Sequence, residues 1–350
     1  MDAGALILGK TNTHEFAFGV TGVNPHYGIC HNPWDKTRIS GGSSSGSAVA
    51  VAAGMALAAV GTDTGGSIRI PASLCGVVGL KPTYGRVSLR GIFPLSWNLD
   101  HAGPITKTVR DSALMLQSMA GYDHLDPSSV DHPLDEYLIH IDEGVKAWRI
   151  AFAEGAYIEE ANTEVIAAVD EAGRLFKSLG ADIVKVNMDH LRELALANSQ
   201  MVGADAAAFH RDRLSEHPDW FGDDVRERLE IGRALSSTDY SLARRKQIQG
   251  RNWANEFFRK FDILMLPTTP ITAPMIEGSD AIAQARQLTR FTAPFNLTGL
   301  PALSIPCGFD SKGLPIGLQL VSGAWSEVSV LRAGQAFESA SNWHNQFPMG

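Results

Sequence analysis

The sequence predicts an α/β fold, in which a mixed central β-sheet is covered by helices on both faces. Short apolar runs typical of buried strands alternate with amphipathic helical patterns along the chain. The clearest unit is a strand at residues 150–152, a helix at 163–179 that ends before Gly180, and a second strand at 183–186. Hydrophobic residues make up 44% of the 350 residues and charged residues 19%, so a sizeable core is expected.

In the first third of the chain, the sequence predicts a series of short strands and helices. A short apolar run at 5–8, stopped by Gly9, predicts a buried strand. Residues 11–45 are rich in Gly, Asn, Pro, Thr and Ser, which predicts mostly loop. Compact small-residue or apolar segments then predict a helix at 46–55, a strand at 56–60, a helix at 67–74, a strand at 77–80 and a helix at 108–119.

We expect residues 1–350 to form a single domain. Residues 190–260 are charged and less strongly patterned, and we interpret them as a peripheral helical insertion within that domain. Further strands are predicted at 263–266, 302–305 and 316–321, and a last helix at 328–338.

Composition excludes several classes of function. The net charge of −8 argues against a nucleic acid or an anionic membrane as a partner. The three cysteines, Cys30, Cys75 and Cys307, are far apart and form no CxxC pair, which predicts neither a disulfide framework nor a metal site. Nor does the first segment have a signal peptide's basic region. We therefore expect a cytoplasmic protein, with no cofactor and no metal.

The sequence Gly-Ala-Leu-Ile-Leu-Gly-Lys-Thr at residues 4–11 fits the P-loop pattern GxxxxGK[ST]. A P-loop needs a strand before its glycine-rich loop, whereas here the four middle residues are themselves the predicted strand. Because an apolar strand cannot also curl around phosphate, the context argues against nucleotide binding.

The sequence Gly-Ser-Ser-Ser-Gly at residues 42–46 fits the nucleophile elbow GxSxG, with Ser44 at its centre. That elbow should directly follow a hydrophobic strand, but residues 31–40 have a loop composition. The context again argues against the motif.

A longer pattern covers residues 41–72. Two glycine-rich turns, each carrying serine, are joined by a compact segment of small residues. Such turns bring hydroxyl groups and free backbone N–H groups together, which is what a nucleophile and an oxyanion hole require.

This segment resembles the amidase signature. Flanking sequences agree, among them Gly-Lys-Thr-Asn at 9–12, Gly-Leu-Lys-Pro-Thr-Tyr-Gly-Arg at 79–86, Pro-Thr-Thr-Pro at 267–270 and Asn-Leu-Thr-Gly-Leu-Pro at 296–301. The resemblance covers nearly the whole chain and is weakest over 190–260. It implies the fold of that family.

The resemblance also implies residue roles. Ser67 in the second turn would attack the amide carbonyl, and Ser43, placed after a cis peptide bond, would relay a proton. The backbone N–H groups of Thr64, Gly65, Gly66 and Ser67 would form the oxyanion hole. Asp63 and Arg69 would support the turns, and Ser44 would lie in the site.

The family's catalytic lysine should lie on an upstream strand of pattern apolar-apolar-Lys-Asp. None of the 42 residues before Ser43 fits that pattern. Lys10 is the first substitute to consider, but it matches a structural lysine of the family, and Lys36 and Lys81 have no better claim. The resemblance therefore implies a chain that lacks the family's N-terminal helices and its lysine-bearing strand.

Three functions remain open. The first is an amidase that turns a small-molecule amide into an acid plus ammonia or an amine through a serine acyl-enzyme, alone or as a homodimer. The second is the glutaminase (A) subunit of a tRNA-dependent amidotransferase. The third is an inactive, truncated remnant.

Overall fold

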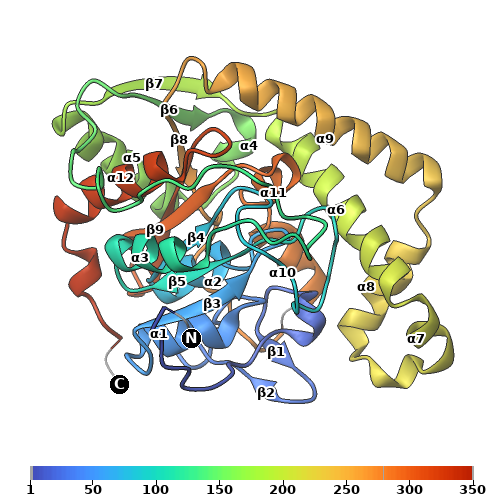
Figure 1. Ribbon diagram of the computed structural model, residues 1–350. Helices are drawn as coiled ribbons and strands as arrows, with labels where there is room; N and C mark the ends of the chain where they lie inside the picture. The colour runs from blue at the N-terminus through green and yellow to red at the C-terminus, as the bar shows by residue number, and fades with distance from the viewer. Residues whose placement is uncertain (1–2, 279, 349–350) are drawn as a thin grey trace.

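An eight-stranded mixed β-sheet forms the centre of the computed structural model, which describes residues 3–278 and 280–348 (Figure 1). Neighbouring strands are antiparallel except at one end, where β6 is parallel to both β8 and β7. In spatial order the strands are β3 (Ala58–Thr62), β5 (Ala102–Thr106), β4 (Val78–Lys81), β9 (Ala302–Phe309), β10 (Pro315–Val321), β8 (Ile263–Pro267), β6 (Arg149–Glu154) and β7 (Asp182–Asn187). The predicted α/β fold with a mixed sheet is confirmed.

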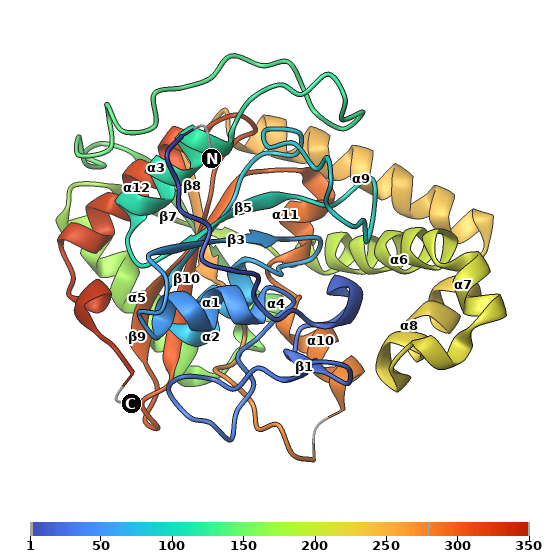
Figure 2. The ribbon, with the colours of Figure 1, turned by 60° about the horizontal axis from the view of Figure 1, so that its bottom comes forward.

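Helices cover both faces of this sheet, as Figure 2 shows. On one face, α2 (Arg69–Cys75) packs so closely that a Cβ on Gly79 would meet Ala72 at 2.6 Å. On the other face, a Cβ on Gly334 of α12 (Glu327–Ser339) would meet Leu303 at 2.5 Å. The first face also carries α1 (Ser45–Ala52), and the second also carries α3 (Val109–Met119) and α5 (Thr163–Ser178).

The predicted strand–helix–strand unit is present as β6, α5 and β7. The Asn162 side chain accepts a hydrogen bond from the N–H of Glu164 and so caps the start of α5. Just beyond its end, Gly180 takes a left-handed backbone angle, φ +90°. The apolar face of α5 buries Phe176 completely, which fixes the helix against the sheet.

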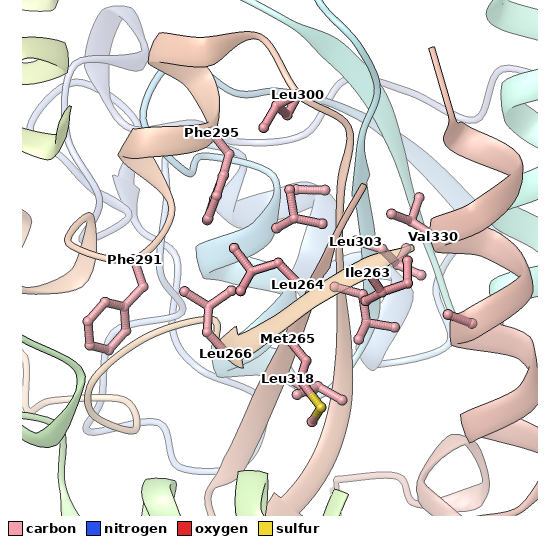
Figure 3. Packing of buried hydrophobic residues seen from close by; sticks show 14 of the residues in the cluster. Ile263, Leu264, Met265, Leu266, Phe291, Phe295, Leu300, Leu303, Leu318 and Val330 are labelled. Carbon is pink, nitrogen blue, oxygen red and sulfur yellow. The ribbon is translucent and has the colours of Figure 1, made fainter. Parts of the chain in front are cut away.

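The largest hydrophobic cluster surrounds the central strands (Figure 3). All five residues of β8 are buried, which explains why this strand has an uninterrupted apolar sequence. Its Leu264 and Leu266 lie beside Phe291 and Phe295, which come from the segment that leads into α11 (Ala293–Thr298) and from α11 itself. The core therefore reaches the helices that border the site.

The segment predicted as helical at 190–260 forms four α-helices that project at one side of the sheet (Figure 1). The inner helix α6 packs against α8, α9 and α11, and a capping box of Ser236 and Asp239 begins α9. The helices are α6 (Leu191–Phe209), α7 (Arg211–Glu216), α8 (Asp223–Arg233) and α9 (Ser237–Phe257), followed by α10 (Ala281–Leu288).

The strand predicted at residues 5–8 is wrong. This segment has no regular structure (Figure 2), and Leu6, Ile7 and Leu8 are 88%, 70% and 77% exposed. A strand needs a hydrogen-bonded neighbour, and no described strand pairs with these residues. The P-loop interpretation also fails here, because no described strand precedes Gly4 and no α-helix begins at Thr11.

One central strand escaped the sequence analysis. Strand β5 has the sequence Ala-Gly-Pro-Ile-Thr, and glycine and proline are rare inside strands. Gly103 is required because a Cβ there would meet the carbonyl oxygen of Leu80 at 2.2 Å. The close approach of two strands therefore explains the unfavourable composition.

No helix in the described part of the chain is long and apolar enough to cross a bilayer. Cys30, Cys75 and Cys307 are all free thiols.

A half-buried glutamate at the end of α12, beside the start of α3, gives the fold a testable pH dependence. The Glu338 carboxylate accepts the N–H of Val109 at 3.0 Å, and burial raises the pKa of this carboxyl to about 7. Below pH 4.5 the group is protonated in both folded and unfolded chains, so it has no effect there. As the pH rises towards 7, the unfolded chain ionises first, and folding loses about 1–3 kcal/mol after allowing for partial exposure.

We therefore expect Glu338→Gln to unfold at a higher temperature than the original chain near pH 7, with the difference vanishing near pH 4.5. Thermal unfolding followed by circular dichroism across this range tests it. Glu171→Gln, at an exposed position in α5, is the control and should follow the original chain. A difference that is constant with pH would contradict the assignment.

Candidate active site

Two glycine-rich turns meet at the end of β3, where they bring Ser43 and Ser67 to the same region. The first turn leads into α1 and contains a cis peptide bond between Gly42 and Ser43, as the resemblance implies. The second turn connects β3 to α2. A backbone hydrogen bond from the N–H of Ser44 to the carbonyl oxygen of Ser67, 3.2 Å long, joins the two turns.

Asp63 organises the second turn. Its carboxylate is fully buried and accepts the N–H of Gly66 at 2.7 Å and the N–H of Ile68 at 3.1 Å. Such bonds from two nearby backbone donors hold the chain in a tight curve. Gly66 itself must be glycine, because φ is +137° and a Cβ would lie 2.3 Å from the hydroxyl of Thr292.

The buried charge of Asp63 is balanced by Arg69, whose Nη2 lies 2.9 Å from Oδ1. The guanidinium also donates to the side-chain oxygens of Gln319 and Asn296, both at 2.6 Å, and to the carbonyl oxygen of Thr292 at 3.0 Å. Burial alone would raise the pKa of Asp63, but the charge and hydrogen bonds of Arg69 outweigh it and hold the pKa well below its usual range. The ion pair is therefore fully charged and hydrogen-bonded.

Three carbonyl groups of the second turn accept hydrogen bonds from side chains of other segments. The carbonyl oxygen of Asp63 accepts from Asn296 at 2.8 Å, that of Thr64 from Asn198 at 3.2 Å, and that of Gly65 from the Thr292 hydroxyl at 2.6 Å. The N–H of Gly66 is already used by Asp63. Among the described residues, no group accepts a hydrogen bond from the N–H of Thr64, Gly65 or Ser67, so these three donors remain available.

A second carboxylate, that of Asp100, positions Thr64. Asp100 accepts the Thr64 hydroxyl at 2.7 Å and the N–H groups of Leu95 and Ser96 at 2.9 and 3.1 Å. Burial raises the pKa of Asp100 to about 6, although these hydrogen bonds oppose the shift. The contact links the second turn to the loop that carries Leu95.

Ser67 lines a cavity of about 150 Å³, together with Thr64 and Gly65. Helices α6, α8 and α10 form much of its wall, and the loop at residues 17–20 closes another side. The lining also includes Asn198, Ser199, Val202, Arg228, Ile231, Ile282, Ala285, Arg286 and Thr289. The residues that carry the nucleophile and the free N–H donors therefore line a largely apolar pocket.

Ser44 does not have the free hydroxyl that a nucleophile elbow requires. Its Oγ donates to the carbonyl oxygen of Thr62 at 3.2 Å and accepts the N–H of Thr62 at 3.1 Å. The turn also follows a loop rather than a strand. Ser44 therefore fastens the first turn to the end of β3.

The hydroxyls of Ser43 and Ser67 have no hydrogen-bond partner among the described residues. Lys10 and Lys36 are exposed, and neither contacts these serines. Lys81 is fully buried, where its amine donates to the carbonyl oxygens of Pro82 and Leu300. Burial and the nearby Arg69 lower the pKa of Lys81 well below its usual value. No described lysine is therefore in contact with the two serines.

Sequence reasoning missed the residues that hold the turns from a distance. Asn296 and Gln319 are buried amides on α11 and β10, more than 200 positions along the chain from the turns they support. Asn296 begins one of the segments on which the resemblance rested, whereas Gln319 is the one polar residue in an apolar strand. Such an isolated polar residue was the only signal for its role.

Comparison with known proteins agrees with this geometry. Residues 1–331 match the family model described as Amidase. This chain belongs to the amidase family. Members of such a family hydrolyse amide C–N bonds, which fits a serine beside free backbone N–H donors.

Three known proteins are similar to this amidase in sequence or structure. It is 43% identical to an amidase from Pseudomonas putida over 99% of this chain and 75% of the relative. It is 41% identical to the A subunit of the glutamyl-tRNA(Gln) amidotransferase of Prochlorococcus marinus (strain MIT 9312), over 96% and 75% of the two chains. A crystal structure of a peptide amidase in complex with the inhibitor chymostatin superimposes with a TM-score of 0.85 at 30% identity, over 100% of this chain and 77% of that one.

The buried ion pair leads to a prediction for this amidase. Replacing Arg69 by methionine leaves the Asp63 charge buried and unpaired, so we expect a loss of about 3–5 kcal/mol in the free energy of unfolding. Urea denaturation measures this change. Arg90→Met, which breaks an exposed pair with Asp123, is the matched control and should leave stability nearly unchanged. Equal effects of the two variants would contradict the role given to Arg69.

Proposed function

We propose that this chain hydrolyses a small-molecule amide with Ser67 as nucleophile. The Ser67 oxygen adds to the amide carbonyl, the C–N bond breaks, and the serine proton leaves with the nitrogen as ammonia or an amine. Water then hydrolyses the resulting ester to the acid and restores the serine. The single observation that carries this proposal is that Ser67 lines the cavity beside three unused backbone N–H groups.

The oxyanion hole in this proposal consists of the N–H groups of Thr64, Gly65 and Ser67. Gly66 shapes the turn instead, since its N–H donates to Asp63. Asp63 and Arg69 act as support, because both are buried and neither lines the cavity. Ser43 is proposed as the proton relay, supported by its place in the turn that is bonded to Ser67 through Ser44.

A serine-directed fluorophosphonate tests the nucleophile. We expect the probe to label Ser67, because its phosphoryl oxygen can accept the free N–H donors. Ser67→Ala should abolish the labelling found by mass spectrometry of the peptide. Ser44→Ala is the control, and labelling should persist in it. Loss of labelling in the Ser44 variant alone would favour the elbow interpretation.

The second part of the proposal concerns the base that would accept the proton of Ser67. A serine at its free pKa is a weak nucleophile, and no described lysine contacts Ser43 or Ser67. We therefore expect these 350 residues to turn over a simple aromatic amide slowly. Loss of one member of a serine triad leaves a residual rate of roughly 10³–10⁴ over water in other hydrolases.

Lys10 provides the matching test. Because it is exposed and contacts neither serine, Lys10→Ala should leave both the slow turnover and the labelling rate unchanged. Steady-state kinetics and the time course of labelling measure the two rates. Full activity of the original chain that is lost in Lys10→Ala would make Lys10 the base and overturn this part of the proposal.

A glutaminase component of a larger enzyme is the second candidate, favoured by relatives named as the A subunit of glutamyl-tRNA(Gln) amidotransferase. Such a component would release ammonia from glutamine and pass it to a partner. Stable co-purification with a second protein, together with turnover of glutamine in preference to simple amides, would favour this function. An inactive remnant would show neither labelling of Ser67 nor turnover.

The assembly and the compartment complete the proposal. Exposed apolar side chains at Met55, Leu57 and Val60, near the outer strand β3, support a homodimer that covers them. Size-exclusion chromatography with light scattering tests the dimer. Three unpaired cysteines support the cytoplasm as the compartment.

A further inference from the structure

The cavity beside Ser67 has an uneven distribution of charge. Two of its described lining residues are arginines, Arg228 on α8 and Arg286 on α10, and none is acidic. The other lining residues are neutral, and apolar side chains such as Phe18, Leu95 and Ile231 predominate. A pocket with two positive side chains and no negative one favours an anionic ligand.

Arg228 is held at the cavity wall with donors to spare. Its Nη2 donates to the carbonyl oxygen of Ala281 at 2.8 Å, which connects α8 to the start of α10. Its Nε is buried and has no hydrogen-bond partner among the described residues. A guanidinium has five N–H donors, so most of those of Arg228 are not used by the protein.

Arg286 has no directly bonded acidic partner among the described residues, although its charge and that of Asp280 interact. Its residue is exposed, and no described residue forms a hydrogen bond or an ion pair with it. Burial is the main cause that lowers the pKa of Arg228; the carboxylates of Asp224, Asp280 and Glu227 raise it, and Arg286 lowers it by a smaller amount. An anionic ligand would give the guanidinium of Arg286 the ion-pair partner that the described residues do not provide.

Three acidic residues face Arg228, but each is outside the cavity lining. Asp224 accepts a hydrogen bond from the buried His14 at 3.0 Å and lies 3.9 Å from the Arg228 Nε. Asp280 caps α10 by accepting the N–H groups of Ile282 and Ala283. Glu227 precedes Arg228 on α8. Because none of these acids lines the cavity, the two arginines are the charged side chains that a bound substrate would meet.

We infer that this cavity selects an amide whose other end is a carboxylate, held by Arg228 and Arg286 while the amide carbonyl faces Ser67. Apolar residues between these groups would contact a short methylene chain. A cavity of about 150 Å³ has the volume that accommodates benzene in another protein, which suits the monoamide of a short dicarboxylic acid. The inference rests on the proposed function, because it takes Ser67 as the reacting group.

Binding to the full chain with Ser67→Ala separates recognition from catalysis. We expect calorimetry to find that succinamate, which has one amide and one carboxylate, binds at least about tenfold more tightly than the neutral succinamide, since a charge-assisted bond contributes this much. Malonamate and glutaramate define the chain length. Equal affinity for the charged and neutral amides would overturn the inference.

Arg286 is the residue to change, because a substitution at its exposed position should leave the fold intact. Arg286→Gln should reduce the preference for succinamate about tenfold, and raised salt should weaken the original preference. Arg226→Gln, on the same helix as Arg228 but outside the cavity lining, is the matched control. Retention of the full preference in Arg286→Gln would contradict the assignment.

Charge reversal adds a readout that a folding defect cannot imitate. Arg286→Glu should shift the preference from succinamate towards β-alaninamide, in which an amine replaces the carboxylate. Labelling of Ser67 by the fluorophosphonate tests the nucleophile separately. Labelling without a preference for succinamate would refute only this inference, whereas the preference without labelling would refute only the proposed nucleophile.

Discussion

The buried carboxylate of Asp63 is the interaction on which the site depends. It accepts hydrogen bonds from the turn that presents Ser67 and from two supporting side chains, Arg69 and Asn296. Arg69 extends the network to Gln319 on β10, a strand that is not a neighbour of β3 in the sheet. A charge that is fully desolvated tolerates little movement of its partners. The network therefore fixes the second turn more firmly than its glycines alone could.

This arrangement explains why the backbone donors of the turn face the cavity. A peptide unit that is held by its carbonyl group has its N–H group directed the other way, because the two are opposed in a trans peptide. Asn296 and Asn198 hold the carbonyls of Asp63 and Thr64, whose peptide units carry the N–H groups of Thr64 and Gly65. Preorganised donors need no rearrangement when charge develops on the substrate, which is the main contribution of such a site to catalysis.

The sequence could predict most strands of the sheet, because buried apolar runs and helical periodicity depend on local composition. It could not predict β5, because Gly103 is required there only by the close approach of the Leu80 carbonyl on a neighbouring strand. It was wrong for residues 5–8, since an apolar run becomes a strand only where a partner exists. The turns around Ser43 and Ser67 were apparent because their glycines are close together in sequence. Asn296 and Gln319 were not, because their contacts span more than 200 residues.

The cavity takes its two sides from different parts of the fold. The sheet and α2 supply Ser67 and its donors, whereas α6, α8 and α10 supply most of the surface that a substrate contacts. Arg228 and Arg286 share no hydrogen bond with the Asp63 network. Substitutions on α8 and α10 can therefore accumulate during evolution without disturbing the turn that carries the nucleophile, whereas Asn198 of α6 is hydrogen-bonded to that turn. The same hydrolytic groups can thus acquire new substrates through changes in these two helices.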